Sequence, residues 1–178
     1  MENAAAIRQD GIVHVGYAVD SLTEAADRWH SVFGAGPFLF MPHVEFDELD
    51  AAQGSVVFDH SAAFGACGDL IVELQQIHEI QGPPAVSAAL THRGGPNHLA
   101  YYATDPARER DRLERSGCPV LFRGVTGPVE VMFFQVPWLG HAIEVHRDTE
   151  HIRGVHDKLR ELARGWDGSD LLRPASEL

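Results

Sequence analysis

Two short apolar segments each contain one histidine, and these two histidines are the first residues whose types and spacing suggest chemistry. Residues 12–20 read IVHVGYAVD and place His14 near the start, and residues 96–105 read PNHLAYYATD and place His98 at the matching position. A tyrosine follows three residues later in both segments. Apolar residues alternating with small or polar ones predict a strand in each. The repetition indicates a duplicated unit that supplies one ligand from each half.

Two glutamates inside apolar runs extend this set. Glu73 lies in LIVEL at residues 70–74, and Glu144 lies in AIEV at residues 142–145. A carboxylate buried without a partner is costly, so such a residue is usually paired, protonated or bound to a metal. Two imidazoles and two carboxylates suit one borderline or hard divalent ion, such as Zn, Ni, Co, Fe or Mn.

Four protein ligands on an ion that accepts six would leave two positions for water or substrate. Such an ion can activate a carbonyl or an enediolate as a Lewis acid. The simpler alternative is that both histidines are satisfied core residues and both glutamates face solvent. That alternative is favoured for any one of the four residues alone. Their symmetric placement in two repeats favours the metal site.

The elements that must position these residues recur in the same order. Residues 11–19 predict a strand, SLTE at residues 21–24 matches a capping box that opens a helix, and three more strands follow up to residue 78. The same order returns after a Pro/Gly-rich linker. We therefore predict a single α+β domain of two tandem βαβββ modules, a curved mixed sheet around a metal-binding cleft. The divisions are residues 11–80, the linker 81–95, the second module 96–147, and a C-terminal helix and tail, 148–178.

Three segments outside this repeat carry further expectations. Residues 42–53 are polar and acidic and predict a connection without a strand, while residues 1–10 predict a loose leader. An amphipathic helix over residues 149–166 either covers the sheet or packs on another subunit, which leaves a homodimer open. Residues 171–178 are expected to be a tail.

The composition limits the partners. The chain has 178 residues, a formal net charge of −12 and 44% hydrophobic residues. This charge argues against nucleic acid or an anionic membrane as a partner and leaves a small-molecule substrate open. The two cysteines do not make a disulfide framework, and no secretory segment or membrane-length apolar run is visible. We expect a cytoplasmic protein.

The chain resembles the vicinal oxygen chelate superfamily, which contains glyoxalases, bleomycin-resistance proteins and extradiol dioxygenases. The resemblance covers about residues 12–147 and is closest to the methylmalonyl-CoA epimerase-like glyoxalase group. The motifs that carry it are IVHV at residues 12–15, GAGPF at 34–38, DLIVELQQ at 69–76, NHLA at 97–100 and GHAIEV at 140–145.

The resemblance implies a metal-dependent activity. It assigns His14, Glu73, His98 and Glu144 as metal ligands, and it nominates Glu144 and Glu73 as catalytic residues that move a substrate proton. The implied function is a divalent-metal-dependent lyase or isomerase that chelates vicinal oxygens of a small hydrophobic or thioester substrate. The epimerases use a further glutamate in the third strand of the first unit. The corresponding residues 54–58 carry no acid, so epimerase activity itself is not implied.

Other residues are candidates for substrate contact. Gln75 shares a strand face with Glu73, Tyr102 shares one with His98, and aromatic residues could form apolar walls. The candidates are Gln75, Tyr102, Phe58, Phe134 and, for an anionic group, Arg123. Packing or surface roles are the alternative for each.

Two other functions remain open. An extradiol-type dioxygenase would bind Fe(II) through two histidines and one carboxylate, so it does not need the second glutamate. A ligand-binding protein of the bleomycin-resistance kind would use the cleft without chemistry.

Overall fold

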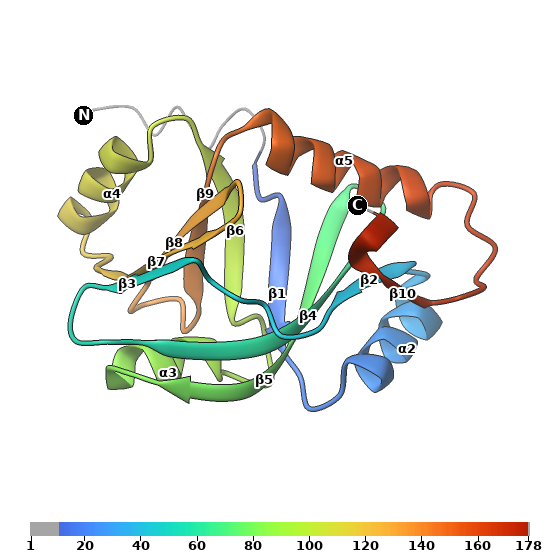
Figure 1. The fold of residues 1–178 in the computed structure, drawn as a ribbon, viewed down its shortest axis with the longest axis horizontal. Helices are drawn as coiled ribbons and strands as arrows, with labels where there is room; N and C mark the ends of the chain where they lie inside the picture. Colours follow the sequence, from blue (N-terminus) through green and yellow to red (C-terminus); the bar gives the residue numbers. More distant parts are fainter. Residues whose placement is uncertain (1–10, 178) are drawn as a thin grey trace.

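The structure, a computed structural model, describes residues 11–177 and is built around one sheet of ten strands in the order β10-β2-β4-β5-β1-β6-β9-β8-β7-β3 (Figure 1). The strands are β1 (His14–Ala18), β2 (Phe38–Met41), β3 (Glu48–Ala51), β4 (Val57–Cys67), β5 (Leu70–Gln81), β6 (His98–Ala103), β7 (Val120–Thr126), β8 (Val129–Gln135), β9 (Ala142–Arg147) and β10 (Leu172–Pro174). The helices are α2 (Leu22–Phe33), α3 (Pro84–Leu90), α4 (Pro106–Arg115), α5 (Glu150–Ala163) and the 3-10 helix η1 (Ala175–Glu177).

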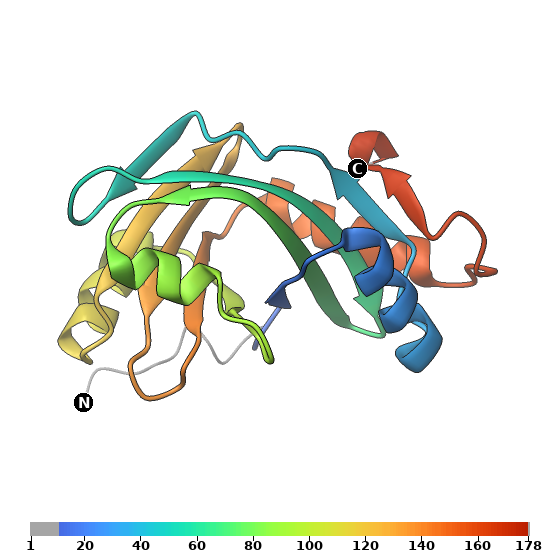
Figure 2. The same cartoon turned by 90° about the horizontal axis from the view of Figure 1, so that it is seen from below.

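The centre of the sheet joins the two halves of the repeat. Strands β1 and β6 pair antiparallel with each other, β5 lies parallel to β1, and β9 lies parallel to β6. The first and last strands of both predicted repeats therefore form the four central strands. Figure 2 shows that the sheet bends into an arch that does not close. The predicted α+β fold with a curved mixed sheet is confirmed. The exact division into modules stays a prediction.

Both edges of the sheet differ from the sequence prediction. Residues 42–53, expected to be a connection, contain β3, which pairs antiparallel with β7 at the far end of the sheet. Residues 171–178, expected to be a tail, contain β10, which pairs parallel with β2. Both strands are short, of four and three residues, and β3 carries acidic side chains. Short polar strands give little periodic signal, because edge positions bury little apolar surface. In the linker the structure agrees with the sequence, which indicates a short helical piece between two Pro/Gly-rich stretches, and α3 lies there.

Local sequence explains where α2 begins and ends. The Ser21 hydroxyl accepts a hydrogen bond from the backbone N–H of Glu24 at 3.3 Å, which satisfies one free donor of the first turn. Gly34 then ends the helix with φ at 68°, a left-handed conformation that glycine adopts without strain. The serine half of the predicted capping box is therefore present, and a glycine ends the helix.

The two faces of the sheet are covered by different helices. On the outer face, Leu22 and Ala26 of α2 pack against Val72 and Leu74, and Leu113 of α4 packs in a matching cluster under the other half. On the inner face, Leu159 and Val155 of α5 pack with Ile71 and Phe64. The helix predicted at residues 149–166 therefore covers the concave face of its own sheet (Figure 1). None of the helices within residues 11–177 is long and apolar enough to cross a membrane.

A buried histidine attaches α5 to the sheet. His156 is 1% exposed, and its Nδ1 is hydrogen bonded to the Tyr102 hydroxyl of β6. The pKa of His156 is lowered to about 2, mainly by burial and to a smaller extent by the charges of His14, His146 and Arg160. This imidazole therefore stays neutral in the folded protein at all ordinary pH values.

Burial of His156 as a neutral group makes stability fall in acid. The unfolded imidazole takes up a proton near pH 6.5 and the folded one does not, so unfolding is favoured as pH falls below 6.5. We expect wild type to lose about 1.4 kcal/mol more unfolding free energy than His156→Phe between pH 7.5 and pH 5.5. Urea unfolding of both proteins in EDTA at the two pH values measures this difference. Equal losses of unfolding free energy in the two proteins would contradict the conclusion that His156 is neutral when folded.

Gly16 permits the contact between β1 and β6. It pairs with His98 across the two strands, and a Cβ atom at this position would lie only 1.9 Å from Cε1 of the His98 ring. The His98 imidazole thus occupies the space that the missing side chain leaves free.

We expect Gly16→Ala to destabilise the protein by about 1–3 kcal/mol, because the His98 ring or the backbone must move to relieve the clash. Gly154→Ala is the matched control. A Cβ atom there meets nothing within 4 Å, and alanine favours a helix over glycine by about 0.8–1 kcal/mol. Urea unfolding of the metal-free proteins should therefore give a lower free energy of unfolding for Gly16→Ala than for wild type and a higher one for Gly154→Ala. A Gly16→Ala protein as stable as wild type would refute the steric account.

Candidate metal centre

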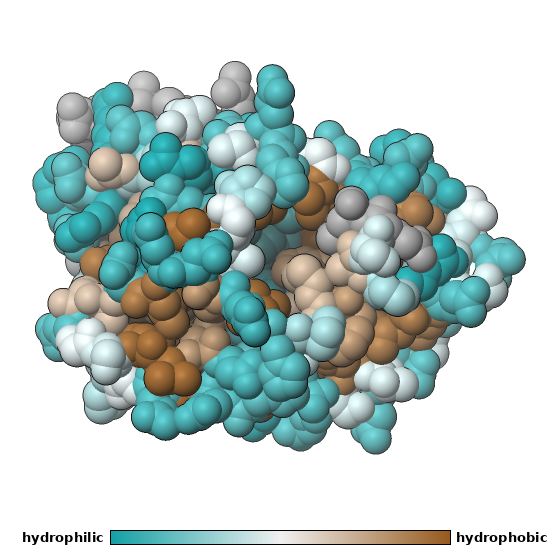
Figure 3. All heavy atoms as spheres, viewed as in Figure 1, coloured by the Kyte–Doolittle hydropathy of each residue, from teal (hydrophilic) through white to brown (hydrophobic). Residues whose placement is uncertain are grey.

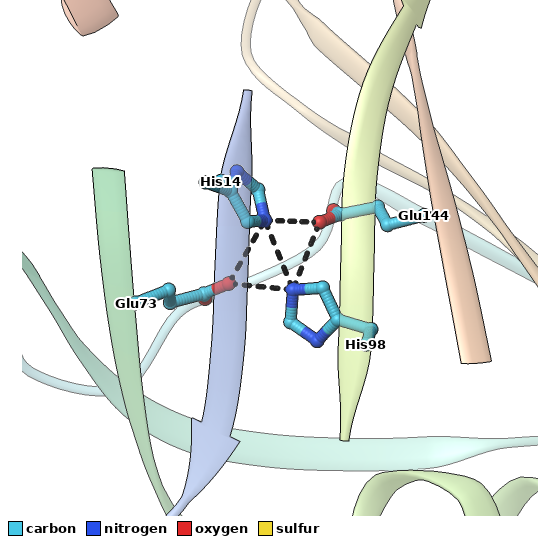
Figure 4. Close-up of side chains that lie close together, drawn as sticks. All are labelled: His14, Glu73, His98 and Glu144. Carbon is cyan, nitrogen blue, oxygen red and sulfur yellow. Dashed lines mark hydrogen bonds and ion pairs between the residues drawn. The ribbon is translucent and has the colours of Figure 1, made fainter. Parts of the chain in front are cut away.

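Four side chains from the four central strands meet at one point on the concave face (Figure 4). They are His14 of β1, Glu73 of β5, His98 of β6 and Glu144 of β9. All four are buried, and one ligand atom of each lies within 4.8 Å of the others. Figure 4 shows the two carboxylates approaching the imidazoles from opposite sides. The sequence prediction named these same four residues.

The separations between the ligand atoms fit a shared metal ion. His14 Nε2 lies 2.9 Å from His98 Nε2 and 2.8 Å from Glu144 Oε2. His98 Nε2 lies 3.0 Å from Glu73 Oε2 and 3.2 Å from Glu144 Oε2, and His14 Nε2 lies 3.4 Å from Glu73 Oε2. Bonds of about 2.1 Å to one ion put neighbouring ligand atoms about 3.0 Å apart in octahedral and about 3.4 Å apart in tetrahedral geometry.

Hydrogen bonding alone leaves this group incompletely satisfied. Glu144 Oε2 is buried and has no hydrogen-bond partner of good geometry among the described residues, and the same holds for His14 Nδ1. Two imidazole nitrogens that face each other at 2.9 Å can share only one proton. The buried group could therefore hold a metal ion, which would accept lone pairs from all four side chains at once.

A chain of amide side chains holds two of the ligands in place. Asn97 Oδ1 bonds His98 Nδ1 at 2.7 Å, and Asn97 Nδ2 donates to Gln75 Oε1 at 2.9 Å. Gln75 Nε2 in turn donates to Glu73 Oε1 at 2.9 Å. An acceptor on Nδ1 of His98 keeps the proton there and leaves Nε2 free to bind a metal. The sequence prediction missed Asn97 as a functional residue, although it stands directly before His98.

The electrostatics of the group favour a cation. Burial raises the pKa values of Glu73 and Glu144, but the neighbouring imidazoles outweigh burial and lower both below the usual range. Burial lowers the pKa of His98, yet its hydrogen bonds and charge interactions with Glu144 and Glu73 raise it to about 9. For His14, burial prevails and the pKa is lowered. Without a metal, two carboxylates and one imidazolium carry net negative charge, and a divalent ion would displace the imidazolium proton and be balanced by the two carboxylates.

Glu73 and Glu144 line a cavity of about 440 Å³. His14 and His98 contact these glutamates but are not part of the lining. Aromatic and aliphatic side chains form most of the remaining wall. Figure 3 shows that the molecule is hollowed near the centre of this face, with hydrophobic residues bordering the opening. The connection between β2 and β3, which runs across the sheet in Figure 1, contributes Val44 and Phe46 to the wall. A small molecule could therefore reach the group.

Two further histidines face this cavity. His146 is 5% exposed, neither of its ring nitrogens has a hydrogen-bond partner among the described residues, and its Nε2 lies 3.4 Å from Glu144 Oε2. His60 is buried against the Phe58 ring at a centroid distance of 4.1 Å, and burial lowers its pKa to about 4. A single imidazole near a strand end carries no sign of burial, so the sequence gives no reason to place either histidine in the cavity.

The other residues named from the sequence divide into two groups. Gln75 and Phe58 line the cavity. Tyr102 shares the concave face but is bonded to His156, and it is not part of the cavity lining. Phe134 lies on the outer face in the cluster under α4, because neighbouring residues of a strand point to opposite sides, and Phe133 lines the cavity in its place.

Arg123, named from the sequence as a contact for an anion, lies in a network of acidic residues. Its guanidinium bonds Glu130 at 2.6 Å and Glu48 at 2.7 Å. These carboxylates raise its pKa above the ordinary arginine value. The side chain joins β3, β7 and β8 and is not part of the cavity lining.

Comparison with known proteins supports the fold. Many solved structures resemble the chain, and two of them illustrate the likeness. A hypothetical protein from Bacillus halodurans aligns with a TM-score of 0.53 and 15% identity over 78% of this chain and 94% of its own. Methylmalonyl-CoA epimerase from Mycobacterium tuberculosis aligns with a TM-score of 0.52 and 21% identity over 81% of this chain and 91% of its own. At these identities the likeness shows the fold alone.

No curated protein sequence matches the chain significantly. The model of one protein family matches residues 13–133, about two thirds of the sequence, and includes His14, Glu73 and His98. Glu144 and α5 lie beyond the matched residues. On this match the chain belongs to the glyoxalase/bleomycin resistance protein/dioxygenase superfamily.

Proposed function

We propose that the protein is a divalent-metal-dependent lyase or isomerase that binds two neighbouring oxygens of a small substrate and moves a proton on the adjacent carbon. One observation carries this proposal. Four buried donor atoms, spaced as metal ligands are, lie at the end of a cavity large enough for a small molecule. A bound divalent ion would polarise a substrate carbonyl and make the neighbouring C–H more acidic.

The surroundings of the two glutamates support different roles for them. Glu73 Oε1 is held by Gln75, which is itself held by Asn97. This carboxylate is therefore fixed and suits a permanent ligand. Glu144 faces the cavity, and its Oε2 is contacted only by imidazole nitrogens, His14 Nε2 at 2.8 Å, His98 Nε2 at 3.2 Å and His146 Nε2 at 3.4 Å, none of them with good hydrogen-bond geometry. Glu144 is thus the better candidate for the group that takes up and returns the substrate proton.

The metal and the compartment are part of the proposal. An imidazole and carboxylate set suits Zn, Ni, Co, Fe or Mn, and elemental analysis of the purified protein distinguishes them. Iron together with oxygen uptake on addition of a catechol would favour the alternative, an extradiol-type dioxygenase. Tight ligand binding that is unchanged by metal removal would favour a binding protein. A cytoplasmic location and a homodimer stay predictions from the sequence.

Glu144→Gln tests the metal site and the proton transfer together. Glutamine keeps the size of the side chain but loses the charge, so we expect metal affinity to fall at least tenfold and exchange of a substrate C–H with solvent deuterium to be lost. Metal content after dialysis, and deuterium incorporation into aromatic α-hydroxy ketones followed by NMR, measure these effects. Glu79→Gln, an exposed glutamate of β5, is the control and should behave as wild type. Full metal content in Glu144→Gln would contradict the ligand assignment.

Asn97→Ala tests the amide chain. Loss of the residue that orients a metal-binding histidine typically lowers metal affinity about 10–100-fold. We expect this loss in a metal titration followed by calorimetry. Asn97→Asp restores an acceptor for His98 and should recover part of the affinity, whereas general damage to the fold would leave it low. Gln81→Ala, an exposed amide at the end of β5, serves as the control. Unchanged affinity in Asn97→Ala would exclude a positioning role.

A further inference from the structure

The cavity over the four ligands is apolar except at its metal end. Its wall contains four phenylalanines, and α5 adds two aliphatic side chains; these residues are Phe46, Phe58, Phe64, Phe133, Ile152 and Val155. His146, whose ring nitrogens have no hydrogen-bond partner among the described residues, lies beside Glu144, and His60 also lines the cavity. A ligand held here would therefore place its polar atoms at the ligand group and an apolar body against the aromatic wall.

The cavity lacks positive charge to balance an anionic body. Neither lysine nor arginine occurs among the described residues that line it. Two arginines outside the lining form ion pairs, Arg123 with Glu130 and Arg160 with Asp157. The two glutamates would balance a divalent ion without help from the substrate. A carboxylate or phosphate on the far end of a ligand would lie among mainly aromatic and aliphatic side chains, with no lysine or arginine of the described lining to pair with it, which is costly.

Helix α5 and η1 supply one wall of the cavity. The lining includes Ile152, Val155 and His156 of α5 and Ala175 of η1, all of which lie outside residues 13–133, the range that the family model matches. Helix α5 is held in place by Leu159, packed with Ile71, and by the bond between His156 and Tyr102. The position of these aliphatic side chains relative to the ligands is therefore fixed by the fold.

We infer that the substrate is a neutral aromatic compound that carries two neighbouring oxygens at one end, and that Ile152 and Val155 of α5 select its ring. This inference rests on the proposed function, because the oxygens are assigned to the metal end of the cavity. It adds the class of the substrate body and the element that recognises it. The polyanionic part of a compound such as a CoA thioester should stay outside the cavity, because no lysine or arginine of the described lining could pair with it.

Three hydroxamates test the inference, because each presents the same pair of oxygens to a metal. Benzohydroxamate carries a phenyl ring, acetohydroxamate carries only a methyl group, and 4-carboxybenzohydroxamate adds a distal negative charge. We expect the zinc-loaded protein to bind benzohydroxamate at least tenfold more tightly than either of the others, measured by calorimetry. Equal affinities, or a preference for the carboxylated compound, would overturn the inference.

Val155→Trp tests the role of α5. The indole should fill the space for the ring, so the preference for benzohydroxamate over acetohydroxamate should fall at least fivefold while acetohydroxamate binding is unchanged. Val32→Trp, at a valine of α2 that is 69% exposed, is the matched control and should keep the preference. If Val155→Trp keeps the wild-type preference for benzohydroxamate, α5 does not contribute to substrate selection.

The same titrations separate this inference from the proposed function. A protein that takes up no zinc, nickel, cobalt, iron or manganese overturns the proposed function. In that case benzohydroxamate is titrated into the metal-free protein. Binding that Val155→Trp abolishes would still support a cavity that selects an aromatic ring. Absence of binding would overturn the inference as well. A protein that takes up metal but does not discriminate among the hydroxamates overturns the inference alone.

Discussion

The pairing of β1 with β6 is the constraint on which the rest of the structure depends. Gly16 lies opposite His98 and beside Glu73, and Ala100 lies opposite His14 and beside Glu144. Each imidazole thus projects over a small residue of the other half, and each small residue is flanked by a carboxylate. A shift of one residue in this register would turn one half of the ligand set to the opposite face. The concave face, the cavity and the position of α5 all follow from this arrangement.

The cost of burying charge explains why the surroundings of the ligands are so polar in an otherwise apolar interior. Two carboxylates without partners would destabilise the fold. Here the imidazoles stabilise them electrostatically, and Gln75 and Asn97 fix one side of the group. Glu144 lacks such support, which leaves the site asymmetric although the strands that build it are related by a repeat. A reactive group and a structural group can therefore come from equivalent positions of a duplicated unit.

The sequence predicted the parts of the fold that repeat, and it failed where interactions are not local. His14, His98, Glu73 and Glu144 could be named because strand periodicity and duplication place them on one face. Strand β3 was not predicted, since its partner β7 lies more than 70 residues away and its own side chains are largely polar. The same limit applies to His146, His60 and Asn97. Their burial and contacts depend on strands and helices that come together only in the folded chain.

Strand β3 also connects the two halves of the chain. It belongs by sequence to the first half, yet it completes the edge of the second by pairing with β7. Residues 96–147 expressed alone would leave β7 with unpaired backbone groups, an edge that invites association with other chains. The first half of the chain therefore protects an edge of the second, and the two halves are joined at this edge as well as through β1 and β6.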